Sequence, residues 1–168
     1  MTEVVDTNVL LIANGQHGDV SPACVRHCAE RLLRITQTGR IAIDDGFRIL
    51  REYGNKANSN RGRGPGDAFL KWVLQNHAVT ARCDRVAITE TAPDQFEEFP
   101  VDPELVAFDP PDRKFVAVAR AHGEQPPILQ GADSKWLGWA DALARHGVTV
   151  DFLCPDDVQR FRKRKGGS

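Results

Sequence analysis

The stretch VVDTNVLLIANG (residues 4–15) places a carboxylate between two apolar runs near the start of the chain. The two valines before the acid are typical of a buried strand, and apolar residues resume at Val9. An acid is unfavourable in such a position unless it is hydrogen-bonded, paired with a cation or bound to a metal. Along the rest of the chain, short apolar runs alternate with helical periodicity, which predicts a parallel α/β sheet. Asp6 would then stand at the carboxyl end of a first strand, roughly residues 3–6.

The size and composition of the chain fit one globular domain. It has 168 residues, of which 41% are hydrophobic and 27% are charged, enough to bury a core. No apolar run approaches the ~20 residues that span a bilayer. Glu3 and Asp6 interrupt any signal-peptide pattern. We therefore expect a cytoplasmic protein with no membrane contact and a single domain over residues 1–158.

Charge is unevenly spread along the chain. The formal net charge is −1, so there is no global attraction to nucleic acid. Residues 86–112 carry eight acids and no Lys or Arg, whereas the segment RFRKRK (residues 160–165) carries five bases. A basic tail of this kind can contact phosphate or a partner. We expect residues 159–168 to be a solvated, disordered basic tail.

The four cysteines are too few and too scattered to predict a disulfide framework. Cys24 and Cys28 lie one helical turn apart with His27 between them, but no second ligand pair has zinc spacing. We expect Cys24 and Cys28 to be small buried residues on a helix.

Turn and periodicity signals divide the chain into further elements. After the first strand, strands are predicted near residues 40–44, 85–89, 126–130 and 148–154. Helices are predicted over residues 21–37, 47–56, 67–79, 110–123, 135–147 and 155–165. Ser21 and Asp67 are the expected caps of two of these helices. The stretch 54–66, with four glycines, is the most loop-like segment and is predicted to be a mobile basic loop.

Four acids follow the strands of this predicted sheet. Asp6 ends the first strand, Glu52 lies in the helix after the second, Asp112 opens a later helix, and Asp133 follows the strand PILQGA. Ligands of parallel α/β sheets bind outside the carboxyl ends of the strands. Clustered carboxylates repel one another, and a divalent cation offsets that repulsion. Oxygen ligands favour Mg²⁺ or Mn²⁺, which suits phosphodiester hydrolysis.

These segments resemble the motifs of the PIN-domain ribonucleases, the fold shared by VapC-type toxins. VVDTNVLL is similar to the opening of that family, an Asp followed by Thr or Ser and then Asn between apolar runs. FRILREY, DPPDRKFVAVARAHG and ILQGADSKW resemble its second, third and fourth motifs. The order and rough spacing hold from residue 4 to about residue 155. The resemblance implies a three-layer α/β/α fold with a central parallel sheet.

The resemblance also implies roles for individual residues. The predicted ligands of one or two Mg²⁺ or Mn²⁺ ions, and the catalytic residues, are Asp6, Glu52, Asp112 and Asp133. Asn8 would fix the Asp6 loop or touch substrate, and Thr7 would support the turn after the first strand. The implied reaction is endonucleolytic cleavage of RNA that leaves 5′-phosphate and 3′-hydroxyl ends. The implied partners are the RNA substrate, an antitoxin protein and a second copy of the chain in a homodimer.

The sequence departs from the family pattern in three places. Many toxins have an acid three residues after the fourth-motif Asp, where this chain has Trp136; Asp141, further along the same helix, is a substitute candidate. Asp109 competes with Asp112, which we favour because it opens the helix. The insert 54–66 and an acidic stretch at 90–109 make the chain longer than a minimal toxin, which weakens the toxin assignment more than the nuclease assignment.

Several other side chains are candidates for substrate contact. Arg61, Arg63, Ser134 and Lys135 are predicted phosphate contacts, with a disordered loop as the alternative for the two arginines. Trp136 is predicted to pack in the core, with stacking on a base as the alternative.

Each acid also has a purely structural interpretation. Asp6 could cap the following turn, Asp112 could interact with its own helix N-terminus, and Asp133 could form a turn. Glu52 has basic neighbours in its helix and could form a solvated ion pair. The nuclease hypothesis therefore rests on the four acids as a set.

Two other functions remain open from the sequence. A phosphatase of the haloacid dehalogenase type also begins with an Asp after the first strand, but it needs a second Asp two residues on, where this chain has Asn8. A non-catalytic module that binds RNA or protein is the third hypothesis.

Overall fold

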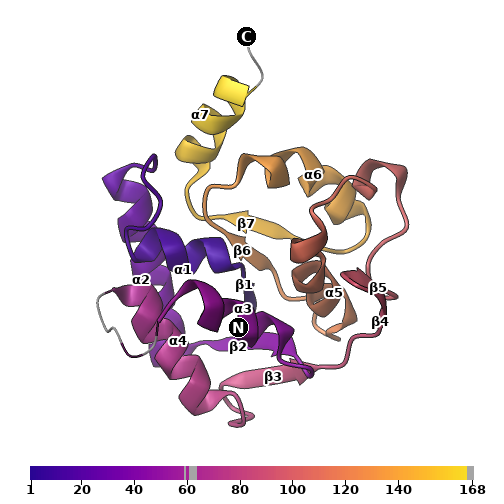
Figure 1. Ribbon diagram of the computed structural model, residues 1–168, viewed down its shortest axis with the longest axis horizontal. Helices are drawn as coiled ribbons and strands as arrows, with labels where there is room; N and C mark the ends of the chain where they lie inside the picture. Colours follow the sequence, from indigo (N-terminus) through magenta and orange to yellow (C-terminus); the bar gives the residue numbers. More distant parts are fainter. Residues whose placement is uncertain (59, 61–63, 166–168) are drawn as a thin grey trace.

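The computed structural model of the chain describes residues 1–58, 60 and 64–165. Its centre is a five-stranded, fully parallel sheet with the strand order β3–β2–β1–β6–β7 (Figure 1). The strands are β1 (Thr2–Val5), β2 (Arg40–Asp44), β3 (Cys83–Val86), β6 (Ile128–Gln130) and β7 (Val150–Phe152). The predicted parallel α/β sheet is confirmed.

Helices cover both faces of the sheet and complete a three-layer α/β/α arrangement (Figure 1). On one side α1 (Thr7–Ala13), α2 (Pro22–Thr38) and α4 (Pro65–Asn76) pack against one another. On the other side lie α5 (Arg113–Ala121) and α6 (Ser134–Arg145). The helix α3 (Arg48–Lys56) follows β2 and contacts α1, α4 and α5, and α7 (Pro155–Lys165) follows β7 and contacts α6.

The central strands are buried on both faces. Val4 and Val5 of β1, Ile41 and Ile43 of β2, and Leu129 of β6 have no solvent-exposed surface. Covered parallel sheets have such continuous apolar strands, because each strand faces a helical layer on either side. Asp6, the first residue after β1, therefore lies at the edge of an apolar core.

The direction in which the chain builds the sheet reverses beside β1. From β1 the chain adds β2 and β3 on one side, then returns to add β6 and β7 on the other. Val4 pairs with Ile128 and Val5 with Leu129, so β1 and β6 end side by side. Ligands of open α/β sheets bind outside such a switch point. The segments after these two strands contain Asp6 and Asp133.

Local structure around the loops differs from the sequence prediction. A short helix, α1, begins directly after Asp6, and α4 begins at Pro65 with Gly64 as its cap. The prediction that Asp67 caps this helix was wrong. Asp67 is buried inside the first turn of α4, where its carboxylate accepts hydrogen bonds from the side chain of Asn14 and the backbone of Asn58.

The acidic stretch before α5 has its own small structure. It contains the hairpin strands β4 (Glu90–Ala92) and β5 (Gln95–Phe96), followed by two 3₁₀ turns, η1 (Pro103–Leu105) and η2 (Pro110–Asp112). Phe96, Leu105 and Phe108 are buried, so this stretch is anchored by apolar contacts rather than solvated throughout.

The predicted helix over residues 155–165 is confirmed as α7, which corrects the expectation of a disordered tail from residue 159. Val158 is buried, and the Asp157 carboxylate accepts hydrogen bonds from the backbone and hydroxyl of Ser21, which dock the helix on the start of α2. Residues 166–168 lie outside the described residues.

The sequence did not predict the one disulfide found among the described residues. Cys24 in α2 forms a disulfide with Cys154 at the start of α7, across 130 residues, while Cys28 and Cys83 are buried free thiols. Within the described ranges, no helix has the combined length and apolar character needed to cross a membrane.

Candidate functional site

Asp6 is the most deeply buried acid of the candidate site. It is the N-cap of α1, and its Oδ2 accepts a hydrogen bond of 2.9 Å from the backbone N–H of Asn8. Its other oxygen, Oδ1, is buried and has no hydrogen-bond partner. A buried oxygen without a donor is destabilising, because it has lost its hydrogen bonds to water and forms none with the protein. The capping interpretation thus explains one oxygen of Asp6 and leaves the other unexplained.

The other three predicted acids lie close enough to Asp6 for their charges to raise its pKa. Its pKa is raised well above the ordinary value, first by burial and next by the charge of Asp112, with smaller contributions from Glu52 and Asp133. The N–H of Asn8 opposes this rise but does not cancel it. Four acids that are distant in sequence therefore converge on one edge of the sheet, as the sequence predicts.

Asp109 joins this group. One carboxylate oxygen from each of Asp109, Asp112 and Asp133 lies within 4.8 Å of the other two, a spacing at which the three could hold one metal ion. Burial, Glu52 and Asp133 raise the pKa of Asp112 to about 6. Asp112 precedes α5 but its side chain makes no capping hydrogen bond, and a hydrogen bond from the side chain of Trp136 only partly offsets the rise of its pKa. The sequence favoured Asp112 over Asp109, and the structure brings both together.

Glu52 is held differently from the aspartates. Lys114 of α5 is buried, and its Nζ lies 2.8 Å from Oε1 of Glu52; the same ammonium also donates to the carbonyl of Pro111. The hydroxyl of Thr7 donates to Oε2 of Glu52. The predicted solvated pair with neighbours in α3 is therefore replaced by a partly buried pair with a lysine from another helix. Lys114 was missed because nothing in its local sequence indicates that it turns inward.

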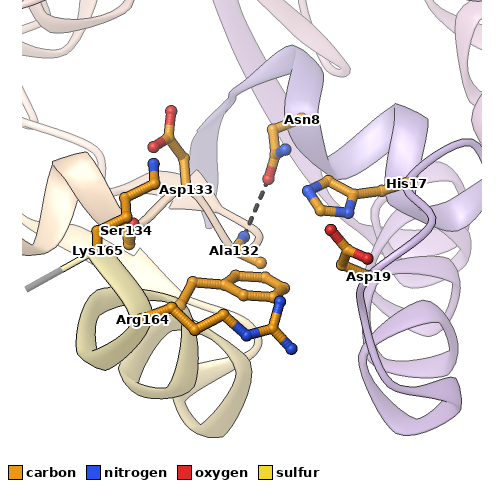
Figure 2. Close-up of a pocket in the computed structure, with 9 residues that line it drawn as sticks. Asn8, His17, Asp19, Ala132, Asp133, Ser134, Arg164 and Lys165 are labelled. Atoms are coloured by element: carbon orange, nitrogen blue, oxygen red, sulfur yellow. Dashed lines mark hydrogen bonds between the residues drawn. The ribbon is translucent and has the colours of Figure 1, made fainter. Parts of the chain in front are cut away.

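Asn8 links the two strand ends that meet at the switch point. Its Oδ1 accepts a hydrogen bond of 3.0 Å from the backbone N–H of Ala132, between β6 and α6 (Figure 2). Gly131 makes this approach possible, because a Cβ there would collide with the side chains of Asn8 and Ile12. Asp133 follows at once and caps α6 through the backbone N–H of Lys135. Through this hydrogen bond Asn8 holds the segment after Asp6 against the segment after β6.

Three other predicted side chains lie in the first turn of α6. Lys135 is exposed and pairs with Asp109 at 3.2 Å, while Ser134 is largely buried. Trp136 is fully buried against Phe108, so it packs in the core and offers no face to a base.

Three other candidates remain, of which the structure describes one. Asp141 is exposed and does not belong to the group of converging oxygens found among the described residues. Arg61 and Arg63 lie outside the described residues.

A cavity of about 310 Å³ has one acid of the cluster, Asp133, in its wall (Figure 2). Asn8 and Asp133 form part of its wall, and residues of α7 form another part. The acidic edge is therefore continuous with a concave surface large enough for a small ligand or one unit of a polymer.

No protein-family model, curated protein or solved structure matches this chain. The likeness of its motifs to the PIN-domain ribonucleases thus stays a prediction from the sequence. What the site can do has to be inferred from its geometry and charges.

Proposed function

We propose that this chain is a Mg²⁺- or Mn²⁺-dependent endoribonuclease of the PIN-domain type. One observation carries the proposal: Asp6, Glu52, Asp112 and Asp133 repel one another at the switch point of a parallel sheet. Acids in such a cluster are stable as anions when a divalent cation lies among them. The orphaned Oδ1 of Asp6 supports this fit, because a bound cation would give that oxygen a partner.

The aspartates and Glu52 would have separate tasks. Asp112 and Asp133 would hold the ion, with Asp6 and Asp109 as further oxygen donors. When bound, the ion would supply positive charge at the phosphoryl group and acidify water for attack. Glu52 already has a cation in Lys114, so we infer one divalent ion per chain rather than two. Lys114 and Thr7 would keep Glu52 in place at the edge of the ion site.

The alternatives have less support. A phosphatase of the haloacid dehalogenase type needs an acid at position 8, where the amide of Asn8 instead accepts a hydrogen bond from Ala132. A non-catalytic binding module gives no reason to keep an acid with a buried oxygen that has no hydrogen-bond partner. A toxin role with an antitoxin partner, and a homodimer, are further proposals that the sequence resemblance alone supports.

The test is cleavage of a labelled single-stranded RNA by the purified chain with Mg²⁺ or Mn²⁺. Asp6→Asn should reduce cleavage by about 100-fold or more, while the variant remains folded because an Asn oxygen can still accept the N–H of Asn8. Asp141→Asn, which removes an exposed acid outside the cluster, is the matched control and should leave the rate unchanged.

Two results would overturn the assignment. One is full cleavage by Asp6→Asn, or by the wild type in excess chelator. The other is hydrolysis of a small phosphomonoester with no action on RNA, which would favour the phosphatase.

A further inference from the structure

Helix α7 is fixed against the body of the protein close to the candidate site. At its start, Asp157 accepts hydrogen bonds of 2.7 and 2.8 Å from the backbone and hydroxyl of Ser21. In its middle, the ring of Phe161 stacks on His17, with centroids 5.8 Å apart and planes 21° from parallel. The last turn of the helix therefore has a defined position even though it is strongly basic.

That last turn lines the same cavity as the acidic site. Arg164 and Lys165 of α7 form one part of the wall, and Asn8 and Asp133 form another (Figure 2). Asp133 is thus shared between the cluster and the cavity, so whatever occupies the cavity lies next to the proposed ion.

The two basic side chains are available for a ligand. In the part of the chain that the structure describes, neither Arg164 nor Lys165 forms an ion pair with an acid, although Asp19 and Asp133 also line the cavity. Arg160, one turn earlier, is instead committed to Asp157 at 2.9 Å. The guanidinium of Arg164 lies over the Phe161 ring, 5.7 Å from its centroid, which limits its freedom and keeps it at the cavity.

We propose that Arg164 and Lys165 form a phosphate subsite for the backbone of single-stranded RNA, next to the acidic site. This inference rests on the proposed nuclease function and names the path of its substrate. With the scissile phosphate at Asp133, the strand continues into the cavity and a neighbouring phosphate meets the two cations. The chain as a whole carries a net charge of −1, so binding of a polyanion requires a local basic site of this kind.

The size and composition of the cavity suit a nucleotide. Its volume of about 310 Å³ is at the lower end of ligand pockets, enough for one unit of a strand rather than a duplex. His17 contributes an aromatic wall whose Nδ1 is buried without a hydrogen-bond partner.

The test measures binding without catalysis, so that it stands apart from the nuclease assay. The full chain is titrated in excess chelator against a fluorescently labelled single-stranded RNA at several salt concentrations. Each phosphate contact on a single strand contributes about 0.7 to the slope of log K against log salt. The double variant Arg164→Ala/Lys165→Ala should lower that slope by about 1.4 and weaken binding roughly 20-fold at about 0.1 M salt.

A second double variant separates a defined subsite from general charge. Arg162→Ala/Lys163→Ala removes the same charge from the same helix, but neither residue lines this cavity. It should leave the salt slope nearly unchanged. In cleavage assays the first double variant should raise KM with kcat little changed, as expected for lost binding that is equal in ground and transition states.

The outcomes distinguish the subsite from the function. Equal weakening by both double variants, or none by either, would overturn the subsite while leaving the nuclease assignment intact. Selective weakening by Arg164→Ala/Lys165→Ala in a protein that never cleaves RNA would uphold the subsite and overturn the nuclease. Absence of RNA binding by the wild type would overturn the subsite outright.

Discussion

Replacing Asp112 by Asn should make the metal-free protein more stable at neutral pH. Burial and the charges of Glu52 and Asp133 raise the pKa of Asp112 from 3.8 to about 6. The folded state therefore keeps this proton to a higher pH than the unfolded chain, and deprotonation between pH 3.8 and about 6 destabilises the fold. Two pKa units correspond to about 3 kcal/mol, which partial solvent exposure of the carboxylate reduces to about 2 kcal/mol.

The assay is thermal and urea unfolding of both proteins in excess chelator, at pH values from about 4 to 8. Asp112 has no capping hydrogen bond to lose, and an amide oxygen can still accept the hydrogen bond from Trp136, so the substitution should remove the repulsion and keep the local contact. Near pH 4 the two proteins should be about equally stable. Above pH 6 the variant should unfold about 4–8 °C higher, given the size of the chain. Its stability should rise less on addition of Mn²⁺ than that of the wild type.

A pH-independent loss of stability in Asp112→Asn would refute this reasoning, because it would mean that the carboxylate stabilises the metal-free fold. The same substitution at Asp141, an exposed acid, serves as the control. Asp141→Asn should change stability by less than about 0.5 kcal/mol at every pH.

Two further predictions concern the Lys114–Glu52 ion pair and the Cys24–Cys154 disulfide. Lys114→Met should leave Glu52 without its cation and lower the free energy of unfolding by about 2 kcal/mol in chelator, measured by urea denaturation; unchanged stability would mean that the pair is not formed. Reduction of the Cys24–Cys154 bond, which closes a loop of 130 residues, should cost about 3 kcal/mol in the same experiment. A Cys28→Ser variant, which keeps the disulfide, should respond to reductant as the wild type does.

The sequence predicted the convergence of the acids because that convergence follows from topology. Parallel strands must all end at one edge, so residues directly after them become neighbours whatever their separation in the chain. Asp6 comes directly after β1 and Asp133 follows β6 after a short turn, and the adjacent pairing of β1 and β6 brings them together. To predict the positions of these two acids, it was enough to recognise the strands and to infer that they run parallel.

The features that the sequence did not predict depend on side-chain directions across the core. Lys114 is one residue among many on a helix, and only the packing of α5 against α3 turns it toward Glu52. Cys24 and Cys154 come together because α7 docks on the start of α2, which requires the whole sheet to be in place. Such contacts have no local signature, since they arise from two surfaces that meet only in the folded state.

The other buried acids of the chain show what the candidate site lacks. Asp44 is fully buried, yet its two oxygens accept the backbone N–H groups of Arg48 and Ile49. Asp157 is satisfied by Ser21 and Arg160. Among the described residues, Asp6 has the one buried carboxylate oxygen that is left without a donor.

The fold supplies hydrogen-bond donors to both oxygens of Asp44 and of Asp157, but it supplies none to Oδ1 of Asp6. The unsatisfied oxygen stands where like charges also gather, and each of these features alone destabilises the metal-free protein. A single positive ligand would relieve both at once. The coincidence of the two at the switch point of the sheet is the strongest physical reason to place a cation, and with it the chemistry, at Asp6.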